Sequence, residues 1–125
     1  MLPVITLLRR SPKPVNILIL TDSLKDLPAK LLTDEEAVYA RKRLAGKGKE
    51  IVLINRLGTL LFIAKTEKGK TTPVRLEKWR RTGESLLGAI HEHSLSRLTL
   101  LDQGNHPEEM LALAEGIVLG NYQFL

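Results

Sequence analysis

Three histidines are the first residues to suggest chemistry, because imidazole binds metal ions and transfers protons near neutral pH. His91 and His93 stand two positions apart near the end of an expected helix. Side chains at i and i+2 point to different sides of a helix, so these two cannot ligate one ion unless the helix has frayed. His106 precedes the last expected helix, and we expect it to hydrogen-bond at that helix start. The spacing therefore predicts structural or solvent-exposed histidines and no metal site.

Acidic residues gather in two groups, each at the start of an expected helix, where the helix dipole alone accounts for them. The groups are Asp34, Glu35 and Glu36, and then Glu108 and Glu109. General acid–base catalysis needs a carboxylate pair held together in an apolar pocket, and nothing in this spacing requires one. The serines lack the glycine context of a nucleophile elbow, and the chain has no cysteine. We therefore expect these residues to be non-catalytic and to bind no cofactor.

A run of basic residues is the candidate site for a polyanion: Arg41, Lys42, Arg43, Lys47 and Lys49. Residues 1–70 hold 14 basic and 7 acidic residues, a net charge of +7, whereas residues 71–125 hold 5 and 7, a net charge of −2. Phosphate binding needs clustered cations, but sequence readout usually also needs an inserted helix or interleaved aromatic residues. Only Tyr39 is near. Binding of nucleic acid and an ordinary solvated surface both stay open.

The size and composition are those of one globular domain, residues 1–125. Hydrophobic residues make up 43% and aromatic residues only 4%, so the core must be aliphatic. At the amino end the charges follow the apolar run, the reverse of a secretory signal, and no window approaches 18 consecutive apolar residues. Together with the lack of cysteine, these features predict a cytoplasmic protein with no membrane partner.

The hydrophobic pattern predicts strands over residues 4–8, 15–20, 50–55, 59–65 and 96–101. Only a short turn containing prolines separates the first two, so we expect them to be neighbours. The pair 50–55 and 59–65 is expected to form a hairpin around Arg56-Leu57-Gly58. Strands interleaved with helices predict an α/β fold, a three-layer helix–sheet–helix sandwich, and the hairpins predict a mixed sheet.

Start signals and apolar stripes predict three helices. Thr33 and Glu36 form a capping-box pattern before a helix over 34–44, which Gly46 and Gly48 would end. Thr72-Pro73 begins a second helix, whose stripe at helical period is expected to face the core: Leu76, Trp79, Gly83, Leu86, Leu87 and Ile90.

The last helix begins near Pro107, and its wide apolar arc predicts that it is largely buried: Met110, Leu111, Leu113, Ala114, Ile117 and Val118. Ala112, Gly116 and Gly120 recur at i, i+4 and i+8. We expect this smooth strip to pack tightly on the sheet.

The end of the chain, ALAEGIVLGNYQF, resembles the end of the N-terminal domain in the leucine (cytosol) aminopeptidase family. There an alanine-rich helix reading A-E-G-x-x-L-G-x-Y-x-F leads into the metal-dependent catalytic domain. The matching residues are Ala114, Glu115, Gly116, Leu119, Gly120, Tyr122 and Phe124. The earlier layout is similar too, from NRLG at residues 55–58 through the second helix to the strand ending at residue 101.

The resemblance implies a macro-domain-like, non-catalytic N-terminal domain whose partner is its own C-terminal catalytic domain. The family's two-metal site and its N-T-D-A-E-G-R-L signature lie in that domain, and no such text occurs here. The implied parent holds zinc or manganese, removes N-terminal residues from peptides and assembles as a hexamer; some bacterial members also bind DNA. Tyr122, Phe124 and Leu125 are then expected to contact the catalytic domain.

Two functions therefore remain open. The first is an accessory and assembly domain of an aminopeptidase. The second is a stand-alone binding module, either for nucleic acid through residues 1–70 or for a nucleotide through the macro-domain-like fold, although the chain lacks the glycine-rich loop expected for a nucleotide.

Overall fold

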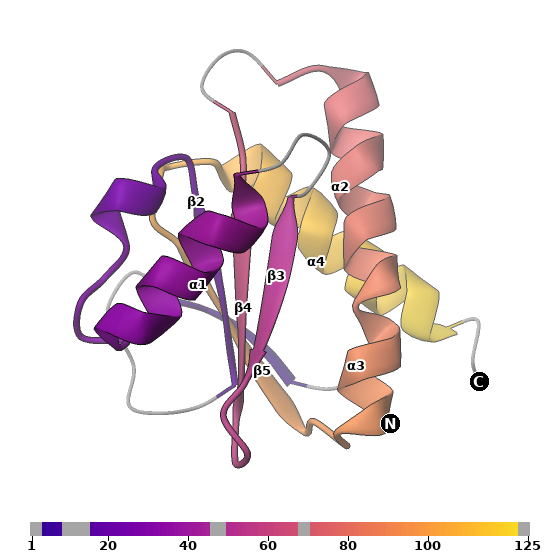
Figure 1. Ribbon diagram of the computed structural model, residues 1–125. Coiled ribbons are helices and arrows are strands. Elements are labelled where there is room, and N and C mark those ends of the chain that lie inside the picture. The colour runs from indigo at the N-terminus through magenta and orange to yellow at the C-terminus, as the bar shows by residue number, and fades with distance from the viewer. Residues whose placement is uncertain (1–3, 9–15, 46–49, 68–70, 123–125) are drawn as a thin grey trace.

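The computed structural model describes residues 4–8, 16–45, 50–67 and 71–122, which form a helix–sheet–helix sandwich (Figure 1). The fold class predicted from the sequence is thus confirmed. In chain order the elements are β1 (Val4–Leu8), β2 (Ile17–Thr21), the 3-10 turn η1 (Leu24–Asp26), α1 (Asp34–Leu44), β3 (Ile51–Asn55), β4 (Leu60–Lys65), α2 (Pro73–Ser85), α3 (Leu87–Glu92), β5 (Arg97–Asp102) and α4 (Pro107–Tyr122).

The sheet has five strands in the order β1-β5-β2-β4-β3. β1, β5, β2 and β4 run parallel to one another, and β3 pairs antiparallel with β4 at the edge, as the predicted hairpin requires. The prediction that the first two strands are neighbours is wrong, because β5 lies between them. All five residues of β2 are buried, so this strand needs a partner on each side, and β4 and β5 supply them.

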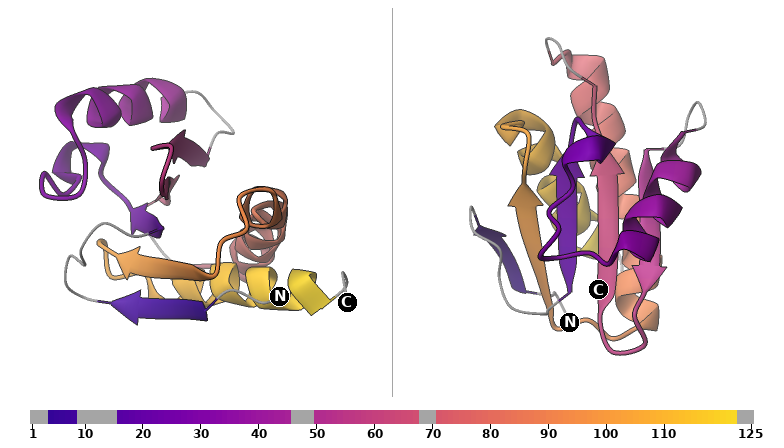
Figure 2. Two further views of the ribbon diagram at one scale, coloured as in Figure 1. Left: turned by 90° about the horizontal axis from the view of Figure 1, so that it is seen from below. Right: turned by 60° about the vertical axis from the view of Figure 1, so that its left-hand side comes forward.

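The two faces of the sheet carry separate cores, with α1 on one face and α2, α3 and α4 on the other (Figure 2). Successive residues of a strand point to opposite faces. Leu18 and Leu20 of β2 therefore join the core beneath α2 and α4, whereas Ile17 and Ile19 join the core beneath α1. Covering on both faces explains why the parallel strands are continuously apolar.

The predicted helix starts are confirmed. Thr33 and Glu36 make both hydrogen bonds of the capping box at α1, and the Thr72 hydroxyl accepts the backbone N–H of Arg75 at α2. The second predicted helix is divided, since α2 ends at Ser85 and α3 begins at Leu87. Its apolar stripe is nevertheless buried from Trp79 onward. None of the helices in these described stretches is both long enough and apolar enough to cross a lipid bilayer.

Two expectations for α4 are corrected. Leu111 is 60% exposed, so the buried arc is narrower than predicted. The small-residue strip packs on α2 and not on the sheet: a Cβ added to Gly116 would lie 1.9 Å from the carbonyl oxygen of Arg80. Gly83 of α2 is equally close to α4, because its added Cβ would lie 2.1 Å from the carbonyl oxygen of Leu113. The spacing of small residues predicts that another backbone comes close, but it does not predict which element supplies that backbone.

Candidate functional site

The carboxyl ends of β2, β4 and β5 lie at one edge of the sheet, where open α/β sheets commonly bind ligands. Polar residues follow each strand at this edge. Asp22 comes after β2, Thr66 after β4, and Asp102 ends β5. Helix α4 begins at Pro107, five residues beyond Asp102, with His106 directly before it.

His106 is the centre of a polar cluster at this edge. Its Nδ1 lies 3.1 Å from Oε2 of Glu109, and its Nε2 lies 3.3 Å from Oδ2 of Asp22. The backbone N–H of His106 donates to Oδ2 of Asp102 at 2.7 Å. Glu109 is only 2% exposed and also accepts the hydroxyl of Thr71. The cluster thus links β2, β5 and α4 to the segment before α2.

The donors and acceptors within this cluster are matched by geometry. Both ring nitrogens of His106 face carboxylate oxygens, one of Asp22 and one of Glu109, so an N–H on either nitrogen has an acceptor. Removing one partner from such a buried group leaves an uncompensated charge or polar atom, which is costly. The cluster therefore fastens α4 to the sheet.

The order of these groups does not suit nucleophilic catalysis. In a Ser-His-Asp triad the imidazole contacts the hydroxyl directly. Here the carboxylate of Glu109 lies between the Thr71 hydroxyl and the His106 ring. Moreover, every buried side-chain nitrogen and oxygen among the described residues has a hydrogen-bond partner. The polar atoms of this cluster are occupied with one another.

The expectation that His106 hydrogen-bonds at the start of the last helix is confirmed. The expectation that the helix dipole alone accounts for Glu109 is wrong, because this carboxylate is buried between His106 and Thr71. His106 and Glu109 stand at the local spacing i and i+3, but no local signal places Asp22 or Thr71 beside them. Asp22 is separated from His106 by 84 positions and Thr71 from Glu109 by 38.

The other two histidines lie apart from this cluster. His91 of α3 contacts Asn121 of α4, with 3.0 Å between Nε2 and Oδ1. His93 lines a small hollow of about 150 Å³ near the β3–β4 turn. Among the residues that the structure describes, no three or more His, Asp or Glu side chains are grouped so as to hold a metal ion.

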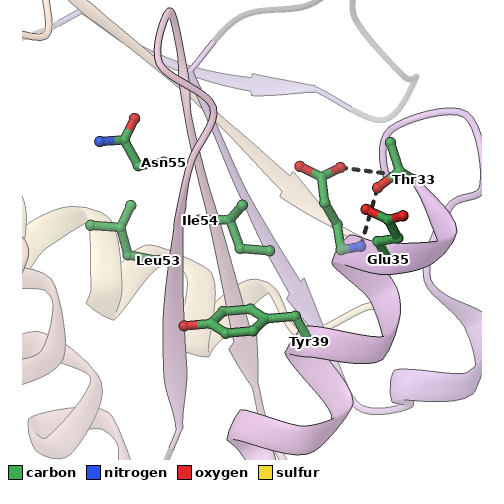
Figure 3. Close-up of a pocket in the computed structure, with 7 residues that line it drawn as sticks. Thr33, Glu35, Tyr39, Leu53, Ile54 and Asn55 are labelled. Atoms are coloured by element: carbon green, nitrogen blue, oxygen red, sulfur yellow. Dashed lines mark hydrogen bonds between the residues drawn. The ribbon is translucent and has the colours of Figure 1, made fainter.

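A second region of interest is a shallow hollow of about 330 Å³ between α1 and β3 (Figure 3). It is lined by Thr33, Glu35, Glu36, Tyr39, Leu53, Ile54 and Asn55. A further hollow of about 410 Å³ shares Thr33 and Glu36 with it. Tyr39 and Leu53 are 45% and 37% exposed, so the region offers apolar surface to a partner.

An ion pair borders these hollows, since Glu36 lines both of them and Arg56 lines the larger one. Arg56 donates through Nε to Oε2 of Glu36 at 2.7 Å and through Nη2 to Oε1 at 2.9 Å, a two-pronged contact. The same guanidinium donates to the carbonyl of Leu31. The hydrogen bond from Arg56 outweighs partial burial and lowers the pKa of the Glu36 carboxyl. Glu36 is therefore a charged anchor for the start of α1.

The predicted polyanion patch is described only in part. Arg41, Lys42 and Arg43 are exposed at the end of α1, while Lys47 and Lys49 lie outside the described residues. Nε of Arg41 donates to the carbonyl of Leu24 at 3.2 Å. The guanidinium of Arg43 lies 5.9 Å from the centre of the Tyr39 ring. The predicted interdomain residues Phe124 and Leu125 and the side chain of Tyr122 also fall outside the described part.

The chain matches no protein-family model, no curated protein and no solved structure.

Proposed function

We propose that the chain is a non-catalytic accessory and assembly domain of a metal-dependent leucyl aminopeptidase. In this proposal a C-terminal catalytic domain holds zinc or manganese and removes N-terminal residues from peptides. The whole protein works in the cytoplasm as a homo-oligomer, a hexamer by resemblance to the family, and the domain is macro-domain-like. The observation that carries the proposal is that residues of the A-E-G-x-x-L-G pattern pack α4 against α2 and α3.

The inner side of α4 supports the proposal because the pattern's residues hold this helix in place. Gly116 allows the backbone of α2 to come close, and Gly120 faces the side chains of Leu87 and Glu84. Glu115 accepts a hydrogen bond from Nε of Arg80 at 3.0 Å. In a domain that serves assembly, such residues are expected to fix the direction of the connecting helix.

The outer side of α4 supports it as well. Leu111 and Leu119 are 60% and 59% exposed on a helix that otherwise packs closely. Exposed large apolar side chains that gather on one element mark surfaces for a partner. We propose that the catalytic domain covers these leucines together with Tyr122, Phe124 and Leu125.

Peptidase assays on two lengths of polypeptide test the proposal. The 125-residue chain is expected to leave a leucine anilide intact with added zinc or manganese, whereas the polypeptide extended by its catalytic domain hydrolyses it. Leu111→Ser with Leu119→Ser is expected to impair the extended enzyme while leaving the fold of the short chain unchanged. Hydrolysis by the short chain alone, or an inactive extended polypeptide, would contradict the proposal.

The exposure of Arg41, Lys42 and Arg43 favours one second candidate, a module that binds nucleic acid. Such a module is retained on heparin and on DNA, and its retention falls as salt rises, because cations on the protein displace counterions from phosphates. Arg41→Ala with Arg43→Ala is expected to weaken that retention. Retention that these substitutions leave unchanged would exclude this patch.

A further inference from the structure

The outer edge of β3 has backbone groups available for a further strand. β3 ends the sheet order, and β4 is its strand partner within the described residues. The N–H of Lys65 donates to the carbonyl of Glu50 at 2.7 Å, and the N–H of Arg56 donates to the carbonyl of Thr59 at 3.0 Å. Because bonding residues alternate along an antiparallel strand, Ile51, Leu53 and Asn55 direct their N–H and C=O groups outward.

This edge lacks the usual protection against pairing. Natural edge strands are commonly blocked by lysine, proline or an inward-pointing charge, and the segment Ile51–Asn55, IVLIN, contains none of them. Exposed apolar side chains adjoin it. Tyr39 of α1, which lines the same hollow as the strand, is 45% exposed, and Leu53 itself is 37% exposed. Figure 3 shows Tyr39 reaching from α1 to the strand.

We propose that this edge pairs with β3 of a second copy of the chain, antiparallel about a two-fold axis at Leu53. This register sets Leu53 against Leu53 of the second copy and Ile51 against Asn55. All outward backbone groups of these residues then have partners. Glu50 and Arg56 also stand opposite each other in this register, but within one chain they already pair with Lys78 and Glu36, so the backbone groups supply the pairing. The strand is thus complementary to itself.

Helix α1 carries the same self-complementarity. Its first turn is acidic, with Asp34, Glu35 and Glu36, and its last turn is basic, with Arg41, Lys42 and Arg43. A two-fold axis perpendicular to the sheet sets the two α1 helices antiparallel on one face. The acidic start of each helix then faces the basic end of the other.

The axis at Leu53 also suits the spacing along α1. Tyr39 lines the same hollow as Leu53, and Glu35 and Arg43 lie four residues to either side of it. Positions i, i+4 and i+8 share one side of a helix. Glu35 is therefore placed to meet Arg43 of the second copy. This match of charges favours a second copy over an unrelated extended peptide.

Sedimentation of the full 125-residue chain over a wide concentration range tests the pairing. The mass is expected to rise from the 14.0 kDa of one chain to twice that value. Leu53→Lys sets two like charges opposite each other and is expected to raise the dissociation constant about tenfold or more. Val74→Lys, at an exposed apolar residue on α2, is the matched control and is expected to change nothing.

Charge reversal separates this pairing from a general loss of stability. Glu35→Lys and Arg43→Glu are each expected to weaken association, and the double variant to restore it, because both members of each pair are then exchanged. A chain that stays monomeric at every concentration overturns the proposal. So does a dimer that Leu53→Lys and the charge reversals leave unchanged. The pairing rests on the described residues alone and stands whether or not the chain proves to serve an aminopeptidase.

Discussion

The two faces of the sheet are covered in different ways. On one face α2 and α4 touch backbone to backbone through Gly83 and Gly116, and α3 extends the cover. On the other face α1 buries only two of its side chains, Ala40 and Leu44, and hollows of about 330 and 410 Å³ lie beside it. The first face is therefore closely packed between helices, whereas the second face is packed more loosely around α1.

The largest effect is expected where the two helices touch. Gly116→Ala places a Cβ against the carbonyl of Arg80, a backbone atom that cannot move without shifting α2. We expect a loss of about 3 kcal/mol in the free energy of unfolding, the upper part of the usual range for overpacking. Urea denaturation followed by circular dichroism measures it.

Gly88→Ala is the matched control, because an added Cβ there meets no atom within 4 Å. Alanine favours helix over glycine, so this variant is expected to be unchanged or more stable by roughly 0.5–1 kcal/mol. Equal stability of the two variants would mean that α2 and α4 do not make the close backbone contact that Gly116 allows.

The next effect concerns the cluster that fastens α4 to the sheet. Glu109→Ala leaves the His106 ring with one carboxylate and removes the acceptor of the Thr71 hydroxyl. We expect a loss of about 2 kcal/mol, since buried polar groups without partners are costly. Glu108→Ala, at the exposed neighbouring position, is expected to cost about 0.5 kcal/mol through the helix dipole alone. Similar losses in the two would show that burial of Glu109 contributes nothing.

A smaller, pH-dependent effect is expected on the face of α1. Arg56 lowers the pKa of Glu36 below its usual value of 4.5. The pair therefore stabilises the fold fully above pH 4.5, and this contribution is lost as the pH falls through the lowered pKa of Glu36. Glu36→Gln keeps a side chain suited to the capping box but loses the charge. We expect it to cost about 1 kcal/mol at neutral pH and less in acid.

The free energy of unfolding of Glu36→Gln and of the unchanged protein, measured from neutral to acid pH, checks this expectation. The difference between the two free energies should shrink as the pH falls. Asp34→Asn, at the first residue of α1, serves as the control. Its unfolding free energy should stay closer to that of the unchanged protein over the whole pH range. Parallel curves for Glu36→Gln would contradict a charged role for the pair.

The smallest effect is expected on the outer side of α4. Leu111→Ser removes a side chain that is 60% exposed and should change the stability of the chain by no more than about 0.5 kcal/mol. Leu113→Ala, two positions on and fully buried, should cost at least about 2 kcal/mol. Thermal unfolding of both variants tests whether Leu113 stabilises the fold and the exposed Leu111 does not.

Much of the local structure could be predicted from the sequence because its causes are local. The capping box places the start of α1 at Asp34, and Thr72-Pro73 places the start of α2. The hairpin of β3 and β4 follows from two apolar runs with a short link. The break between α2 and α3 was not predicted, since the apolar stripe continues across it at helical period.

Features that join distant segments were not predictable in the same way. Residue types alone determined that β1 and β2 are strands and that the strip on α4 meets another backbone. The assembled fold places β5 between those strands and α2 against that strip. It also brings Thr71 to the buried Glu109 and Asp22 to His106. Periodicity and caps act within a few residues, whereas these partners meet only after the whole sheet has assembled.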